Sequence, residues 1–272
     1  MLFNRAVPSG PAGSPESFYT GLELGARAKA DRPYVVSNFV STADGKATAD
    51  GRSRSLGGDG DRAAFRLLRT QVDAVLAGTG TLRVERYGAM TRDQQLREIR
   101  LTEGRAAQPL AVVVSRSGQI PFEIPLFADP GSRIALYAPS STVVPDCAAE
   151  VIFHELASAA EPLAEVLGSL RSEHGVRSLL CEGGPAMFNA MLAENLVDEL
   201  FLTIAPTLIG GDELGITAGG SLRYALALRL VWVLEQDGHL FLRYARADAD
   251  GDHPSAEVAS RTAEPRSSSL AR

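Results

Sequence analysis

The sequence is poor in the residue types that build metal centres and nucleophile–base pairs. Its 272 residues include only two cysteines, Cys147 and Cys181, and four histidines. The cysteines form no CxxC pair, the histidines show no metal-ligand spacing, and the HxE and PCxxC elements of a zinc deaminase are absent. No GxSxG nucleophile elbow occurs. The sequence therefore predicts no metal site and leaves the chemistry to a bound cofactor.

Basic charge and long apolar runs are also scarce. The net charge is −6 and the sequence pI is near 5.3, which disfavours a nucleic-acid partner because phosphate contacts need clustered Lys and Arg. No apolar run approaches a membrane-spanning length, and the first 17 residues contain no secretory apolar region. Two cysteines outside any CxxC pair suit a reducing compartment. We therefore expect a cytoplasmic protein with neither a nucleic-acid nor a membrane partner.

Large apolar residues are rare at both ends of the chain. Residues 1–17 are rich in Gly, Pro and Ser, and residues 247–272 are polar and charged. A segment that buries little apolar surface does not offset the entropy lost on ordering. The composition predicts a flexible N-terminal arm over 1–17, one folded domain over 18–246, and a disordered tail over 247–272.

Strand and helix patterns alternate within the predicted domain. Short apolar, β-branched runs predict core strands at 33–40, 73–78, 109–115, 133–139, 149–154 and 178–184. Apolar residues at helical spacing predict helices at 61–71, capped by Asp61, at 161–175, ended by Gly175, and at 185–196. At least three strands follow, the last two as a hairpin turned at Gln236–Gly238. The pattern predicts an α/β fold with a mostly parallel central sheet, an antiparallel C-terminal edge and helices on both faces.

Two glycine-containing junctions follow predicted strands, VLAGTGTLR (Val75–Arg83) and LLCEGGPAMF (Leu179–Phe188). Glycine lets the backbone approach a ligand closely, and the helix N-terminus that follows offers free N–H groups. Two such junctions can enclose the pyrophosphate of a dinucleotide. Neither matches GxGxxG or the P-loop. One junction alone is more simply explained as a tight turn, whereas the pair favours a nucleotide site.

A polar triplet ends the apolar strand at 109–115. Ser115, Arg116 and Ser117 offer two hydroxyls and a guanidinium, which suit a ribose 2′-phosphate and would select NADPH over NADH. Spacing alone leaves a solvated loop arginine as an equal alternative.

Charged residues mark three other places. Asp44 and Lys46 lie in the polar loop Ser41–Ser55, which follows an apolar strand and is either functional or a simple turn. Glu182 ends a buried strand beside the second glycine junction. Arg69 faces solvent or reaches a substrate anion, and its position on the predicted helix favours solvent.

Several motifs occur together in a fixed order: S-x-x-DGK (Ser41–Lys46), LLR (Leu67–Arg69), DAVLAGTGTLRxE (Asp73–Glu85), a strand ending in SRS, CEGGP (Cys181–Pro185) and LVDELFLTIAPTLIGG (Leu196–Gly211). Through them the chain, from about Pro33 to Tyr244, resembles the pyrimidine reductase domain of riboflavin biosynthesis, and more closely its stand-alone actinobacterial type. The resemblance implies a dihydrofolate-reductase-like fold, a homodimer, and NADPH-dependent reduction of a ribosyl imine.

The resemblance also implies roles for individual residues. NADPH contacts are implied at Val40, Thr81, Glu85 and the turn from Gly183 through Ala190 (Gly183, Gly184, Pro185, Ala186, Met187, Phe188), beside the junction residues Gly78, Thr79 and Gly80. Substrate contacts are implied at Ser53, Arg69, Ala89 and Glu182. Asp44 and Glu182 are the carboxylates that we predict to orient or protonate the reacting nitrogen.

The chain departs from the family pattern at two substrate positions. Asn38 replaces a first-strand lysine and Ser55 replaces a tryptophan, and the deaminase half of the bifunctional enzymes is absent. The missing lysine removes a charge suited to a phosphorylated substrate. The leading hypothesis is a reductase acting on the C=N bond of a small pyrimidine or pterin-type heterocycle. The alternatives are a dihydrofolate-reductase-like activity and a non-catalytic NADPH-binding protein.

Overall fold

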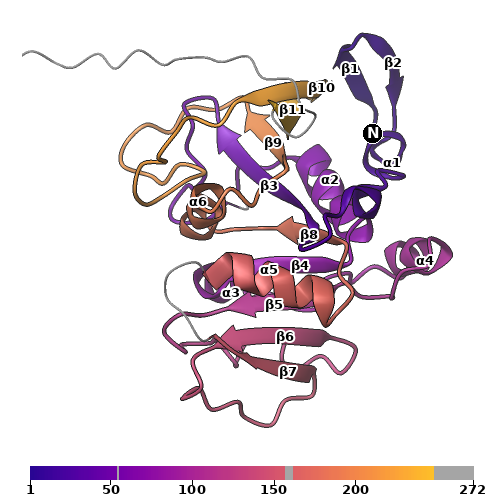
Figure 1. The fold of residues 1–272 in the computed structure, drawn as a ribbon. Coiled ribbons are helices and arrows are strands. Elements are labelled where there is room, and N and C mark those ends of the chain that lie inside the picture. Colours follow the sequence, from indigo (N-terminus) through magenta and orange to yellow (C-terminus); the bar gives the residue numbers. More distant parts are fainter. Residues whose placement is uncertain (54, 157–161, 248–272) are drawn as a thin grey trace, which may run out of the picture.

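A computed structural model describes the chain over residues 1–53, 55–156 and 162–247. In this part, eleven strands form one sheet in the order β2-β1-β10-β11-β9-β3-β8-β4-β5-β6-β7 (Figure 1). The strands are β1 (Phe3–Val7), β2 (Gly10–Gly13), β3 (Tyr34–Thr42), β4 (Ala74–Gly78), β5 (Leu110–Val114), β6 (Arg133–Ala138), β7 (Glu150–Glu155), β8 (Ser178–Cys181), β9 (Glu199–Ala205), β10 (Leu228–Gln236) and β11 (His239–Arg246). The helices are α1 (Pro15–Tyr19), the 3-10 helix η1 (Leu24–Arg27), α2 (Asp59–Thr70), α3 (Thr79–Glu85), α4 (Gln94–Thr102), α5 (Pro162–Ser172) and α6 (Pro185–Ala193).

The sheet confirms the predicted mixture of strand directions. From β9 through β3, β8, β4, β5 and β6 to β7, each strand runs parallel to its neighbour, whereas β9, β11, β10, β1 and β2 pair antiparallel. Strands β3 and β4 precede β8 in the chain. After β7, helix α5 leads back to the middle of the sheet, where β8 pairs between β3 and β4. The ends of β4 and β8 therefore become neighbours.

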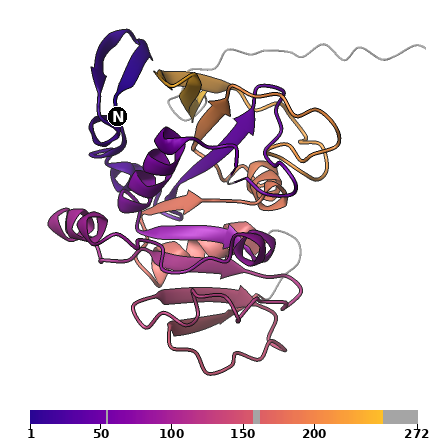
Figure 2. The same cartoon turned by 180° about the vertical axis from the view of Figure 1, so that it is seen from behind.

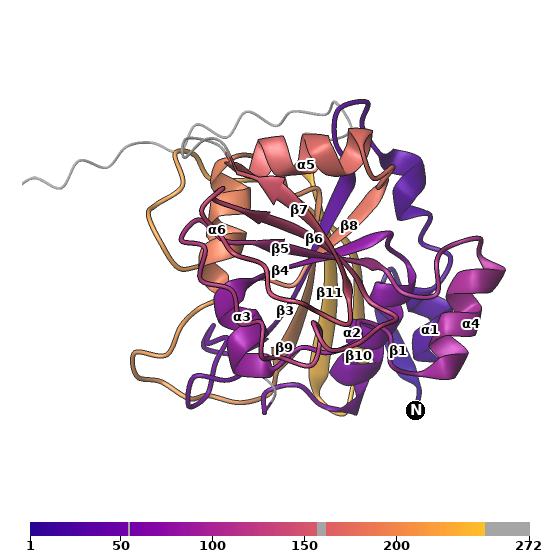
Figure 3. The ribbon, with the colours of Figure 1, turned by 90° about the horizontal axis from the view of Figure 1, so that it is seen from below.

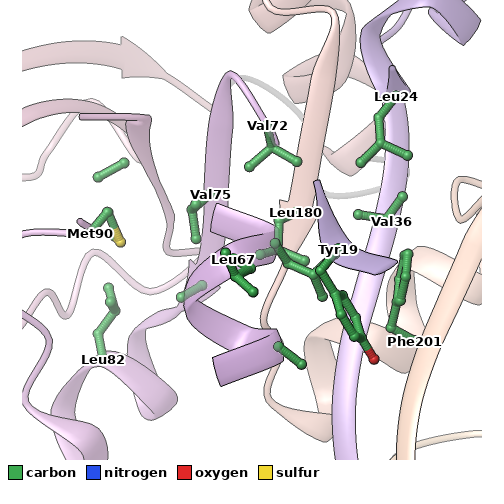
Figure 4. Close-up of a cluster of buried hydrophobic side chains, with 14 of the residues drawn as sticks. Tyr19, Leu24, Val36, Leu67, Val72, Val75, Leu82, Met90, Leu180 and Phe201 are labelled. Atoms are coloured by element: carbon green, nitrogen blue, oxygen red, sulfur yellow. The ribbon is translucent and has the colours of Figure 1, made fainter. Parts of the chain in front are cut away.

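Helices cover both faces of the central sheet, as the sequence predicts (Figure 3). Side chains of successive strand residues point to opposite faces, so one strand supplies both cores. In β4, Val75 belongs to the cluster with Leu67 of α2, and Leu76 belongs to the cluster with Leu167 of α5. Figure 4 shows the first cluster, in which Leu67 and Val75 lie near Leu180. These two cores fix the strand ends that border the site.

Most predicted elements are confirmed, but one helix start is displaced. The hairpin of β10 and β11 turns where expected, with Gln236 opposite His239 and Gly238 at φ 76°. Helix α2 begins two residues early, with Gly58 as its N-cap. The prediction that Asp61 caps this helix is wrong, because Asp61 lies inside the first turn.

The N-terminal residues differ from the predicted flexible arm. Phe3–Val7 pairs with β10 as strand β1, and the Gly10–Gly13 strand folds back on it (Figure 2). Phe3 is fully buried, with its ring centroid 4.6 Å from that of Phe241. The predicted tail falls on residues 248–272, outside the described residues, except for Ala247. Within the described ranges, no helix has the length and apolarity that a membrane crossing requires.

Candidate functional site

A cleft of about 1420 Å³ opens where the central parallel strands end. Its walls come from the carboxyl ends of β3, β4 and β5, from the turn between β8 and α6, and from one side of α2. Ligands of open α/β sheets bind in this position because the connections diverge there and leave a crevice. The sheet topology thus explains why residues distant in sequence share one cavity.

The two glycine junctions meet at the floor of this cleft. The Gly78 N–H donates to the Gly183 carbonyl at 2.7 Å, and helices α3 and α6 begin immediately after the junctions. Gly183 has φ +81°, and a Cβ there would lie 2.9 Å from the Phe39 ring. A Cβ on Gly184 would lie 2.9 Å from the Thr81 hydroxyl, whereas one on Gly80 would meet no atom within 4 Å. The junctions therefore form one cradle, called the glycine cradle below (residues 78–81 and 183–185).

The polar triplet after β5 reaches the same cleft. Ser115 is 3% exposed, and its hydroxyl has no hydrogen-bond partner among the described residues. Arg116 is exposed and lines the cleft beside it. A buried polar atom without a partner is rare in proteins, so this strand end is suited to a polar ligand.

Arg69 and Glu182 form a buried ion pair inside the cleft. Arg69 donates from Nε and Nη2 to the two Glu182 carboxylate oxygens at 2.6 and 2.7 Å, and from Nη1 to the Met90 carbonyl at 2.8 Å. The Tyr87 hydroxyl donates to the same carboxylate at 2.7 Å. Burial, followed by the nearby Glu182 charge, holds the pKa of Tyr87 well above its usual value. Arg69 therefore points inward, contrary to the solvent position that its spacing favours.

Asp61 is a cleft residue that the sequence analysis placed only at a helix cap. Its carboxylate lies against Gly57, where a Cβ would come within 3 Å of it. Burial raises the pKa of Asp61, while the Thr203 hydroxyl, His239 and Arg62 act in the opposite direction. The spacing Asp61, Phe65, Arg69 puts these residues on one side of α2, and this spacing is the signal that could have identified it.

Asp44 lies outside the residues that line the cleft. Its carboxylate accepts hydrogen bonds from the Thr42 hydroxyl at 2.5 Å and from the Gly210 N–H at 2.7 Å. These contacts lower the pKa of Asp44 to about 2. A carboxyl that is ionised at neutral pH and bound to backbone groups is poorly placed to protonate a substrate, so the geometry does not favour the predicted catalytic role.

Most of the other predicted site residues line the cleft, namely Asn38, Val40, Ser53, Arg69, Gly78, Thr79, Gly80, Thr81, Glu85, Ala89, Ser115, Arg116, Glu182, Gly184, Pro185, Ala186 and Met187. The Ser53 hydroxyl donates to Glu85 at 3.1 Å, which joins a predicted substrate contact to a predicted cofactor contact. Gly183 lies behind the lining in the glycine cradle. Phe188 is buried, with its ring centroid 4.6 Å from that of Phe39, so it supports the site from the core.

Comparisons with known proteins identify the fold and the family of this chain. Among solved structures, a pyrimidine reductase-like protein from Corynebacterium diphtheriae matches with a TM-score of 0.71 and 23% identity, covering 86% of this chain and 99% of that chain. At this identity the likeness shows the fold. Riboflavin biosynthesis protein RibD of Mycobacterium tuberculosis is 29% identical over 193 residues, which is 68% of this chain and 47% of RibD. The chain thus spans about half the length of this relative.

A second relative matches over most of its own length. The 2,5-diamino-6-ribosylamino-4(3H)-pyrimidinone 5′-phosphate reductase of Archaeoglobus fulgidus is 30% identical over 188 residues, covering 67% of this chain and 84% of the relative. The family model described as the RibD C-terminal domain matches residues 33–240, which include both glycine junctions and the Arg69–Glu182 pair. This chain therefore belongs to the RibD C-terminal domain family.

Proposed function

We propose that the chain is an NADPH-dependent reductase that delivers hydride to a C=N bond of a pyrimidine-type heterocycle in riboflavin biosynthesis. The observation that carries the proposal is the glycine cradle, closed by the 2.7 Å bond from Gly78 to Gly183, in the same cleft as the Arg69–Glu182 pair. The name of the Archaeoglobus fulgidus relative, a ribosylaminopyrimidinone phosphate reductase, supports this substrate class.

The cleft residues fit a bound dinucleotide phosphate. At the glycine cradle, Gly80 leaves open space where a side chain would otherwise stand, and helices α3 and α6 both begin at the cradle, so their first N–H groups are available to a pyrophosphate. A 2′-phosphate near Arg116 would give the buried Ser115 hydroxyl the partner that it lacks among the described residues. Bound NADPH would supply the hydride.

Hydride addition to the carbon of a C=N bond requires a proton on the nitrogen. We assign the proton to Asp61, because it lines the cleft on the same side of α2 as Arg69, and because burial raises its pKa and so favours the protonated carboxyl. Glu182 already accepts hydrogen bonds from Arg69 and Tyr87 at both oxygens, so we assign it to orientation instead. In this arrangement Glu182 fixes the Tyr87 hydroxyl, which also lies within hydrogen-bonding reach of Arg69.

A phosphorylated substrate also needs cations. Arg62 and Arg66 lie one helical turn apart on α2, and Arg92 lies on the loop before α4; all three line the cleft. They would supply positive charge in a cleft where the neutral Asn38 stands at the position of the family's lysine. The three arginines favour a phosphate-bearing substrate.

The neutral Asn38 supports a second candidate function, reduction of a pterin such as dihydrofolate. Asn38 lines the cleft and offers an amide rather than a charge, which suits the amino and carbonyl groups of a pterin ring. The Asp61 proton would serve a pterin C=N bond equally. The arginines keep the phosphorylated pyrimidine as the first candidate.

The test is the loss of NADPH absorbance with purified protein and each substrate in turn. Turnover of the ribosylaminopyrimidinone phosphate supports the first function, and turnover of dihydrofolate alone supports the second. NADPH binding by calorimetry without turnover of either substrate would mean a binding protein. We also propose a cytoplasmic location, which the two free thiols of Cys147 and Cys181 support.

A further inference from the structure

Two loops that are far apart in sequence are joined at the mouth of the cleft. The Asp44 loop (residues 42–53) follows β3, and the long segment (residues 206–220) follows β9. The Ala43 N–H donates to the Thr207 carbonyl at 2.9 Å, and the Ala47 N–H donates to the Leu214 carbonyl at 2.6 Å. The first part of the Asp44 loop is therefore bound to the long segment at two places.

Asp44 and Lys46 provide the charged contacts of this pairing. Asp44 accepts from the Gly210 N–H at 2.7 Å and from the Ile209 N–H at 3.3 Å. The Lys46 ammonium donates to the carbonyls of Gly211 at 2.7 Å and Glu213 at 3.3 Å. The Asp44 carboxylate binds backbone N–H groups and the Lys46 ammonium binds backbone carbonyls. The two side chains of the DGK motif therefore hold the long segment and do not pair with each other.

The long segment contacts the glycine cradle at its other end. The Ala218 N–H donates to the Pro185 carbonyl at 3.2 Å, and the Asn189 side-chain amide of α6 donates to the Gly220 carbonyl at 3.1 Å. Pro185 is the first residue of α6 and a member of the cradle. One segment thus touches both the predicted phosphate site and the Asp44 loop, and both loops line the cleft.

We propose that Asp44 and Lys46 are positioning residues, and that through the long segment they let a cofactor held at the glycine cradle order the Asp44 loop around the substrate. This inference rests on the proposed NADPH site. In this arrangement Ala47, Thr48 and Ser53 reach their cleft positions only when the long segment is seated on both the cradle and the loop. Cofactor and substrate then bind with positive coupling.

Hydrogen–deuterium exchange with NADP⁺ as the probe tests the link without turnover. In the wild-type chain, NADP⁺ should slow amide exchange at residues 184–190, at 206–220 and at 43–48. In the double variant Asp44→Ala/Lys46→Met, protection at 184–190 should persist, while protection at 43–48 should fall about tenfold through loss of charged hydrogen bonds. Asp44→Asn alone keeps one acceptor oxygen and should retain most of the protection.

Asp212→Ala is the matched control, because Asp212 is an exposed carboxylate on the same long segment. It should exchange like the wild type. The inference is overturned if NADP⁺ protects 43–48 equally in the double variant, or if it protects the cradle but never 43–48. If NADP⁺ protects no part of the wild-type chain, the proposed function itself fails, and the inference fails with it. A melting curve of each variant verifies folding.

Turnover adds a second measurement. The double variant should raise the KM for the pyrimidine substrate about tenfold, with a smaller change in the KM for NADPH, because the cradle stays intact. A fall in kcat at unchanged substrate KM would instead point to a catalytic role for Asp44 and would overturn the positioning assignment.

Discussion

At the scale of single residues, cofactor choice is the property that one side chain can reveal. Arg116→Ala should weaken NADPH about tenfold or more and leave NADH nearly unchanged, because only NADPH carries the 2′-phosphate and a charge-assisted contact contributes about 1.5–3 kcal/mol. Calorimetric titration with both cofactors measures this. Arg83→Ala on α3 is the control, since Arg83 is exposed and lies outside the cleft lining. Equal losses for NADPH and NADH would remove Arg116 from the phosphate site.

Asp61 makes a prediction about pH. Its folded-state pKa is raised, so the rate should decline as pH rises through that pKa and the general acid is lost. The same shift destabilises the fold at neutral pH, because the unfolded chain releases this proton more easily than the folded chain does. Asp61→Asn should therefore lower kcat about a hundredfold and raise the melting temperature. Protonated Asp61 therefore stabilises the fold. This stabilisation is fully present below the pKa that Asp61 has in the unfolded chain, and it is lost as the pH rises through the pKa that Asp61 has in the folded chain.

The control for this prediction is an acid in the first turn of another helix. Glu16 of α1 is exposed and lies outside the cleft lining, so Glu16→Gln should change neither kcat nor the pH profile. An unchanged pH profile in the Asp61 variant would show that another group donates the proton.

The site residues differ in how far the sequence could identify them. The sequence identifies Glu182 because it directly follows a buried strand, and Glu182 has this position in the sheet. Arg69 was misjudged from spacing because its partner lies 113 positions along the chain. The Tyr87 contact likewise depends on a strand inserted late between two earlier ones, and no local pattern encodes that insertion.

At the scale of elements, the glycine cradle is the junction that can be tested most directly. Gly184→Val should weaken NADPH at least tenfold, or about 1.4 kcal/mol, because the side chain would occupy the cradle beside the Thr81 hydroxyl. Gly184 has φ −67°, so the effect is steric and needs no backbone strain. Gly131→Val, in a turn outside the cleft lining, is the control. Unchanged NADPH affinity in the Gly184 variant would exclude this turn from the site.

Elements with their own periodic pattern were predicted, and the N-terminal hairpin was not. Strands such as β5 are buried on both faces and read as unbroken apolar runs. Strand β1 has one buried large residue, Phe3, whereas the apolar side chains of Leu2 and Val7 beside it are exposed. Its place is decided by Phe18, Tyr19 and Phe241, whose rings surround it from other parts of the chain. The composition of residues 1–17 shows that they lack an apolar run, but it does not show that aromatic rings from other parts of the chain bury Phe3.

At the scale of the whole molecule, the antiparallel half of the sheet has two unlike faces. Directly paired antiparallel residues share a face. On one face Phe201 and Phe241 pack with Phe3 and helix α2. On the other, Leu230 and Leu240 are each 38% exposed, on a face shared with Leu242 and Ile204. A sheet face with several leucines left partly in water is suited to burial against another protein surface.

We propose that this second face forms the homodimer that the family resemblance implies. Leu240→Arg should then yield a monomer by light scattering after gel filtration, since a charge in the centre of an interface of roughly 800 Å² per partner would be desolvated without a counter-ion. Leu101→Arg on α4, at an even more exposed leucine, should leave the molar mass unchanged. A wild-type chain that is monomeric at micromolar concentration would exclude the dimer. A dimer that survives Leu240→Arg would place the interface elsewhere on the molecule.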